Sequence, residues 1–176
     1  YYAHFDDADT PLAETVAAFS SLVDAGKVRA IGVSNYTADR VAEWFRIARD
    51  GGYHLPVALQ PHYNLVERGF ETNGLREVAE AEGLSVIPYF SLAEGFLAGK
   101  YRSDADVGAP GASARAGDAA VYLNDRGRTV LAELDRVAAA HGAPVAAVSL
   151  AWLRQQPTII APLASEDLLV VAPWNL

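Results

Sequence analysis

Short apolar runs alternate with amphipathic stretches along the chain. Five runs are so uniformly apolar that they predict buried strands. These runs cover residues 1–5, 29–33, 56–61, 84–89 and 158–163. Between them, apolar residues recur at helical spacing, which predicts helices. The predicted helices cover residues 10–26, 37–50, 71–82, 125–141 and 144–156.

Cap and turn residues mark the limits of the first two helices. Thr10 suits an N-cap and Pro11 suits the first helical position, while Gly26 suits the end of that helix. Gly51 and Gly52 end the next helix, because glycine adopts the left-handed backbone of a helix C-terminus without strain.

The order of these elements indicates a fold class. Strands that are apolar throughout and alternate with helices are typical of a parallel sheet covered by helices, either doubly wound or closed into a barrel. We expect one domain over residues 1–176. Residues 103–118 are rich in Gly, Ala, Ser and Asp, which predicts a surface loop.

Side chains suited to ligand binding stand at the ends of four predicted strands. In doubly wound sheets and in barrels alike, ligands bind at the carboxyl ends of the strands. The residues at these ends are His4, Ser34, Asn35, Gln60 and Tyr89. A small polar residue after one strand commonly caps the next helix. Such residues after four successive strands favour a binding site instead.

Charge and composition exclude several classes of partner. The chain has 176 residues, a net charge of -8 and no cysteine. A surface this acidic repels nucleic acid and anionic membranes, so we expect neither as a partner. No apolar run is long enough to span a bilayer, and the first residues lack the pattern of a secretory signal. The lack of cysteine excludes disulfides and is compatible with the cytoplasmic location that we expect.

Several familiar catalytic motifs are missing from the sequence. No GxGxxG follows a strand and no GxSxG occurs, which disfavours a Rossmann nucleotide site and a serine hydrolase. The stretch GFLAGKY at 95–101 is one residue too short between its glycines for a P-loop. His4, Asp6 and Asp7 stand close together, but a metal needs three or four convergent ligands, and we expect no metal site.

Three segments in order carry a family resemblance. They are RAIGVSNY at 29–36, LQPHYNLVER at 59–68 and IPYFSLAEGFLAGKY at 87–101. Together they resemble the aldo-keto reductases, a family of barrel enzymes that use NADP(H). The resemblance covers almost the whole chain except its last residues. It implies a TIM-type (β/α)8 barrel, of which this chain supplies about five βα units, strands four to eight.

The resemblance implies a role for each residue at the strand ends. Ser34, Asn35 and Gln60 correspond to side chains that hydrogen-bond the carboxamide of the nicotinamide ring. Uncharged donors and acceptors there fix which face of the ring presents its hydride. Tyr89 corresponds to an aromatic residue that stacks on the ring. His4 corresponds to the catalytic histidine that orients the substrate carbonyl.

The stretch after the fourth strand is similar to the loop that lies over the cofactor pyrophosphate. Backbone N–H groups and a nearby lysine there would offset phosphate charge locally in an acidic protein. The cofactor-binding residues implied by this similarity are Phe90, Ser91, Leu92, Ala93, Gly95 and Lys100. Lys100 suits a solvated surface position equally well. Of the other histidines, only His62 stands near enough to Gln60 to suggest a role.

The family's proton donor has no counterpart in this chain. In the family a tyrosine gives the proton, helped by a lysine paired with an aspartate, and all three precede the histidine strand. We therefore hypothesise that the chain is the C-terminal part of a longer reductase, or otherwise incomplete. Residues 166–176 align with nothing in the family, and acidic Glu166 and Asp167 are poor partners for a 2′-phosphate. The choice of NADPH over NADH rests on the resemblance alone.

These observations support one main hypothesis and two rivals. The main hypothesis is an oxidoreductase that transfers hydride from NADPH to an aldehyde or ketone carbonyl beside His4, giving an alcohol. The alternative is a non-catalytic regulatory subunit that binds NADP(H) in the same barrel. A third hypothesis is a half-barrel that pairs with itself. The expected partner is a small carbonyl compound, and its identity and the oligomeric state stay open.

Overall fold

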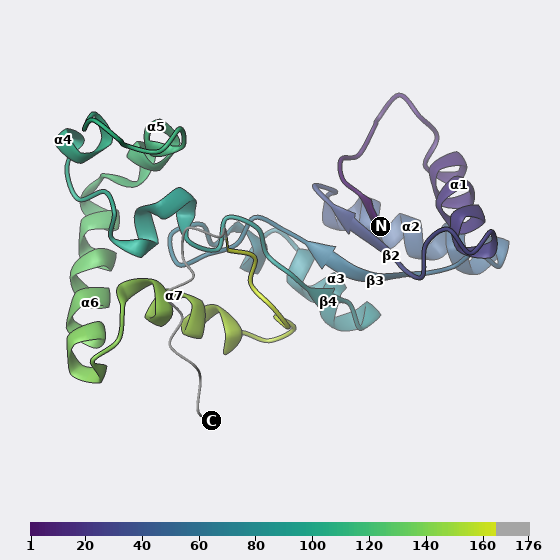
Figure 1. Ribbon diagram of the computed structural model, residues 1–176. Helices are drawn as coiled ribbons and strands as arrows, with labels where there is room; N and C mark the ends of the chain where they lie inside the picture. Colours follow the sequence, from purple (N-terminus) through teal and green to yellow (C-terminus); the bar gives the residue numbers. More distant parts are fainter. Residues whose placement is uncertain (165–176) are drawn as a thin grey trace. The chain divides into compact units, whose positions relative to one another are not determined.

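The computed structural model describes residues 1–164 and contains two compact units. The first unit comprises Tyr1–Pro61, Gly69–Ile87 and Thr158–Ile160. The second unit comprises His62–Arg68, Pro88–Pro157 and, of the described residues, 161–164. Figure 1 labels the helices and strands of both units. The assignment of the whole chain to one domain stays a prediction.

The first unit is built on a parallel sheet of four strands in the order β1-β2-β3-β4. The strands are β1 Tyr2–Ala3, β2 Ile31–Ser34, β3 Pro56–Gln60 and β4 Ser85–Val86. Each strand pairs with its neighbour in sequence, and every pair is parallel. Because a parallel connection needs a crossover, a helix follows β1, β2 and β3 along the chain. The predicted α/β class with a parallel sheet is therefore confirmed.

Three helices accompany this sheet, and each presents a buried apolar face. They are α1 Leu12–Asp24, α2 Ala38–Gly51 and α3 Leu75–Glu82, with a short 3-10 helix, η1, at Gly69–Glu71. In α2 the side chains of Val41, Trp44 and Phe45 are almost completely buried. The ring of Trp44 meets the rings of Phe19 and Tyr36 edge to face, a favoured aromatic arrangement. The apolar periodicity predicted from the sequence is thus the packing face of each helix.

Local capping differs between α1 and α2. The prediction of Thr10 as the N-cap of α1 is wrong, because Pro11 holds that position and makes no side-chain cap. The hydroxyl of Thr10 instead donates to the carboxylate of Asp7 at 2.7 Å. Thr37 does cap α2, where its hydroxyl oxygen accepts a hydrogen bond from the backbone N–H of Arg40 at 3.3 Å.

A close approach between two strands explains the glycine inside RAIGVSNY. Tyr2 in β1 pairs with Gly32 in β2. A Cβ at position 32 would fall on the aromatic ring of Tyr2. Since the ring occupies that space, only glycine fits at this point of the strand. This contact holds β1 close to β2 and so places the chain end of β1, at His4, beside the end of β2.

The predicted strands 84–89 and 158–163 are much shorter than expected. The apolar run 84–89 forms a strand only over Ser85–Val86, and the run 158–163 contributes one bridge, from Ile159 to Val86. Proline has no backbone N–H to donate to a sheet, and Pro88 and Pro162 interrupt these runs. The prediction of a full fifth strand is therefore wrong.

The second unit is helical. Its elements are the 3-10 helices η2 Ala93–Ala98 and η3 Ala120–Tyr122, and the α-helices α4 Asp104–Val107, α5 Ala116–Ala119, α6 Asp125–His141 and α7 Val145–Arg154. The stretch 103–118, predicted as a surface loop, contains α4 and most of α5. The bounds of α6 match the prediction, and the side chain of Asn124 caps it by accepting from the N–H of Gly127. No helix within residues 1–164 has the length and apolarity that a membrane span needs.

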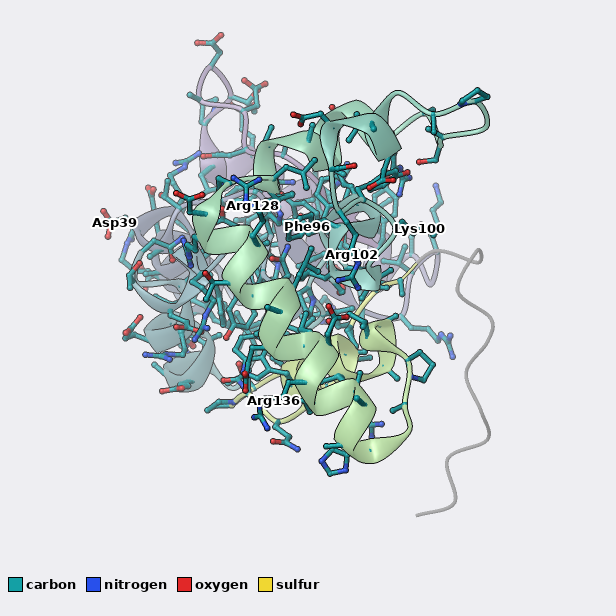
Figure 2. The ribbon with its side chains drawn as sticks, turned by 90° about the vertical axis from the view of Figure 1, so that its left-hand side faces the viewer. Asp39, Phe96, Lys100, Arg102, Arg128 and Arg136 are labelled. Atoms are coloured by element: carbon teal, nitrogen blue, oxygen red, sulfur yellow. The ribbon has the colours of Figure 1, made fainter. Side chains whose placement is uncertain are left out.

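The core of the second unit lies between η2, α5, α6 and α7. Phe96 and Leu97 of η2 are completely buried, and Leu131 and Leu134 of α6 cluster with them. Figure 2 shows Phe96 behind α6 and Arg102 beside the helix. The guanidinium of Arg102 makes a bidentate ion pair with Asp135 of α6. The segment after β4 is thereby fixed to the helical core of this unit.

Candidate functional site

In the first unit, hydrogen bonds connect the ends of β1, β2 and β3. The hydroxyl of Ser34 donates to the backbone carbonyl of Gln60 at 2.7 Å. The amide Nδ2 of Asn35 donates to the backbone carbonyl of His4 at 2.8 Å and to the Ser34 hydroxyl oxygen at 3.1 Å. The structure thus brings His4, Ser34, Asn35 and Gln60 together at the carboxyl edge of the sheet.

The four residues differ in how they can meet a ligand. The Ser34 side chain is fully buried, and its hydroxyl both donates and accepts within the protein. By contrast, the Gln60 amide and the exposed His4 imidazole make no hydrogen bond to any other described residue. Ser34 therefore supports the arrangement, while Gln60 and His4 are the groups that can bind a partner outside the chain.

Asn35 has a strained backbone. Its φ is +57°, in the left-handed region that most side chains avoid. Asparagine tolerates this region better than most residues, because its short amide can hydrogen-bond nearby backbone groups. Strained residues of this kind cluster at functional sites, where the surrounding structure holds them in place. The two donor bonds of Asn35 supply that restraint here.

An ion pair fixes the loop that follows His4. The guanidinium of Arg40 in α2 donates to both carboxylate oxygens of Asp6, at 2.8 Å each, and also to Glu43 at 3.0 Å. Chiefly because of the hydrogen bonds to Asp6, the pKa of Arg40 is raised above its usual value. Asp6 is thus held as an ion-pair partner, and no group of three or more metal-ligating side chains occurs among the residues that the structure describes.

The second unit contains a cavity of about 560 Å³, which is lined largely by the segment that follows β4. Its lining includes six of the residues predicted to bind a cofactor: Tyr89, Phe90, Ser91, Leu92, Gly95 and Lys100. The other lining residues are Glu94, Ser113, Ala114, Arg115, Leu163 and Ala164. Ala93, the remaining predicted residue of this stretch, is completely buried and does not line the cavity.

Two charged residues of this cavity were not singled out from the sequence. Arg115 comes from the Gly- and Ala-rich stretch before α5, and with Lys100 it brings two cations to the cavity. Glu94 adds one carboxylate. Two cations at one cavity favour an anionic ligand. Nothing in the local sequence around Arg115 signals this role, because it depends on where the loop folds back.

The backbone around the cavity is strained at three neighbouring positions. Phe90, Ala93 and Glu94 have φ values of +50°, +47° and +58°. Each of these conformations costs free energy, and the surroundings must compensate. Asn64 contributes to that compensation. It is fully buried, its Nδ2 donates to the Phe90 carbonyl at 2.9 Å, and its Oδ1 accepts the N–H of Val66 at 2.9 Å.

His62 packs directly against the predicted nicotinamide platform. Its ring stacks on Tyr89 at 5.2 Å between centroids and meets Phe90 edge to face at 5.3 Å. Its Nε2 is buried and has no hydrogen-bond partner among the described residues. Burial lowers the pKa of His62, and Glu67 only partly opposes this shift. The imidazole is therefore uncharged at neutral pH, as a stacking partner.

We expect His62→Phe to raise the free energy of unfolding by about 1 kcal/mol, because it keeps a flat ring and removes a buried polar atom that lacks a partner. In the unvaried protein, acid should weaken this region below the ordinary histidine pKa, since the unfolded chain binds the proton more readily. The variant should lose this acid sensitivity. Urea unfolding over a pH series measures both effects. The exposed His141→Phe serves as a control, and a stability loss in His62→Phe contradicts the prediction.

Comparison with known proteins gives a consistent family match. A sequence model described as "Aldo/keto reductase family" matches residues 1–167. The chain is 29% identical over 168 residues to an L-glyceraldehyde 3-phosphate reductase from Escherichia coli (strain K12), covering 93% of this chain and 48% of the relative. It is 34% identical over 155 residues to Protein tas from the same organism, covering 86% and 43%. The chain therefore spans about half the length of these curated relatives.

Solved structures agree with the sequence matches. A glycerol dehydrogenase, AKR11B4, from Gluconobacter oxydans superposes with a TM-score of 0.76 at 26% identity, covering 93% of this chain and 48% of that one. A thermostable aldo-keto reductase, Tm1743, crystallised with the inhibitor epalrestat, gives a TM-score of 0.69 at 25% identity, covering 94% and 48%. These likenesses confirm the predicted fold class, part of a TIM-type (β/α)8 barrel.

Proposed function

The chain belongs to the aldo/keto reductase family, and we propose that it serves an NADP(H)-dependent oxidoreductase that reduces aldehyde or ketone carbonyls to alcohols. The relatives named above include a reductase of an aldehyde and a dehydrogenase of an alcohol, which supports this reaction class. The observation that carries the proposal is a pair of side chains, Gln60 and His4, that make no hydrogen bond to another described residue and lie at the carboxyl ends of β3 and β1, on either side of β2.

The first unit is suited to hold a carboxamide. The Gln60 side chain offers one acceptor and two donors without charge, which complements the amide group on a nicotinamide ring. Beside it, the bonds of Ser34 to the Gln60 carbonyl and of Asn35 to the His4 carbonyl fix the two strand ends. We therefore assign Gln60 as the direct ligand of the carboxamide, with Ser34 and Asn35 as supporting residues that also border the group.

The second unit is suited to hold the charged and flat parts of the cofactor. Lys100 and Arg115 offset phosphate charge at the cavity. Tyr89 offers an aromatic ring to the nicotinamide, supported by the stacked His62. Phe90, Ser91, Leu92 and Gly95 complete the lining. When bound, NADP(H) supplies the hydride of the reaction.

His4 is the one residue of this chain that we assign to the reacting carbonyl. Its exposed imidazole can donate a hydrogen bond to the carbonyl oxygen, which becomes more basic as the carbon accepts hydride. The donor bond of Asn35 to the His4 carbonyl and the Asp6–Arg40 ion pair two residues later fix the backbone on both sides. We assign no tyrosine of this chain as the proton donor. Residues 166–176, which align with nothing in the family, lie outside the described residues.

We expect Gln60→Leu to weaken binding of NADPH about tenfold, because it keeps the side-chain volume and removes the donor and acceptor. Titration of cofactor fluorescence measures the change. Gln155→Leu, at an exposed position after α7, is the matched control and should bind as the unvaried chain does.

The same assay separates the candidate functions. An unvaried chain that does not bind NADPH contradicts the proposal. Equal affinities in Gln60→Leu and the unvaried chain contradict the assignment of Gln60. Oxidation of NADPH by aldehydes and ketones, assayed in the protein isolated from its source, then distinguishes a reductase from a regulatory subunit. Binding without turnover of any carbonyl favours the regulatory subunit.

A further inference from the structure

Glu94 occupies an unexpected place for a carboxylate. It lines the same cavity as the two cations, Lys100 and Arg115. Its φ of +58° is the left-handed conformation that favours glycine, so the chain accepts backbone strain to place a glutamate here. An acid at a site built for an anion opposes the ligand by like-charge repulsion. A glutamate that opposes the ligand at this position therefore needs a functional explanation.

The neighbouring charged groups only partly compensate the negative charge of the Glu94 carboxylate. Burial and the carboxylate of Asp118 in α5 both raise the pKa of Glu94, and Arg115 only partly opposes them. Burial raises the pKa of Tyr122 in η3, and the negative charge of Glu94 adds to this shift. Lys100 is the other charged group at the cavity. The surroundings therefore favour loss of charge from Glu94 at a higher pH than for an ordinary glutamate.

We propose that the carboxylate of Glu94 limits the affinity of this cavity for the cofactor's phosphates, so that removing its charge tightens binding. The inference rests on the proposed function, because it takes the cavity to be the phosphate site of NADP(H). It adds a residue that sets cofactor affinity and makes that affinity depend on pH. Tight binding would slow release of the oxidised cofactor, and an acid at the phosphate site keeps binding reversible.

The sign of the pH dependence follows from the charge. Above its pKa, Glu94 is negative and repels phosphate, so affinity is lowered. Below its pKa, Glu94 is neutral and the repulsion disappears. The ratio of the dissociation constants of the unvaried chain and a Glu94→Gln variant should therefore be largest in base and approach one in acid. The ratio also cancels the titration of the ligand itself.

Calorimetric titration of the full chain with NADP+ tests the proposal, since the oxidised cofactor survives in acid. We expect Glu94→Gln to bind about fivefold tighter at about pH 8, for a repulsion across several ångströms at a partly exposed site. The advantage should shrink as the pH falls toward about 4.3, the ordinary pKa of glutamate, and should begin to shrink at a higher pH than for an ordinary glutamate, because burial raises the pKa of Glu94. Glu94→Gly removes both the charge and the backbone strain and should bind at least as tightly. Circular dichroism verifies that each variant is folded.

A matched control isolates the position of the charge. Glu133→Gln makes the same change in net charge on α6, where Glu133 pairs with Arg136 and does not line the cavity. It should leave the affinity unchanged. If Glu133→Gln tightens binding as much as Glu94→Gln, or if both Glu94 variants bind no tighter than the unvaried chain, the inference is overturned while the proposed function stands. If no variant binds NADP+, both are overturned.

Discussion

Replacing Asn35 with alanine should destabilise the first unit by about 2–3 kcal/mol and weaken NADPH binding at least tenfold. Two costs add. Alanine is strained at the φ of +57° that Asn35 adopts, by about 1–2 kcal/mol. The donor bonds to the His4 carbonyl and to the Ser34 hydroxyl are also lost, at about 1 kcal/mol each before solvent compensates in part. Urea unfolding and fluorescence titration measure the two effects.

Asn35→Gly separates these costs, because glycine adopts the left-handed backbone freely but makes no side-chain bond. We expect it to recover roughly half of the lost stability and little of the lost affinity. If the Asn35→Ala and Asn35→Gly variants are equally stable, the left-handed backbone at position 35 does not cost free energy. If both bind NADPH as well as asparagine does, the side chain does not organise the strand ends.

Replacing Gly127 with alanine should destabilise the second unit by about 3 kcal/mol. A Cβ at this position would overlap the carbonyl oxygen of Tyr122 and approach the ring of Phe96 within 2.9 Å. Phe96 is completely buried, and the Tyr122 carbonyl belongs to the backbone that enters α6, so neither group can yield cheaply. Chemical denaturation followed by circular dichroism measures the loss.

Gly117→Ala is the matched control in the same unit. A Cβ at Gly117 meets no atom within 4 Å, and the residue lies in the helix α5. Because alanine is the better helix former, this change should stabilise the chain by up to about 1 kcal/mol. Equal losses in the two variants would contradict the prediction, because the overlap with neighbouring atoms occurs at Gly127 and not at Gly117.

The sequence predicts helices well where their ends carry local signals. Thr37 and Asn124 cap their helices with side-chain bonds, and the bounds of α6 were predicted to the residue. Thr10 fails because Asp7 competes for its hydroxyl, a contact that depends on the turn between them. The predicted strand 84–89 is too long because apolarity alone does not limit a strand, whereas Pro88 has no N–H to donate to a sheet.

The candidate site was accessible to sequence only in part. Gln60 and His4 could be predicted because they stand at the ends of strands, where a parallel sheet gathers its ligands. Arg115 and Asn64 could not, because one reaches the cavity through a loop and the other acts through the carbonyl of Phe90. The assignment of Ser34, Asn35, Gln60 and Tyr89 to a nicotinamide ring stays a prediction until a cofactor is bound.

Both units are assembled from segments that lie far apart in the chain. The first takes Thr158–Ile160 from near the end of the described residues, and Ile159 there pairs with Val86. During synthesis on the ribosome, the residues up to 87 therefore emerge well before the segment that completes their sheet. Until then Val86 exposes an unpaired backbone edge, a surface on which nascent chains aggregate. We therefore expect this protein to depend on chaperones during translation.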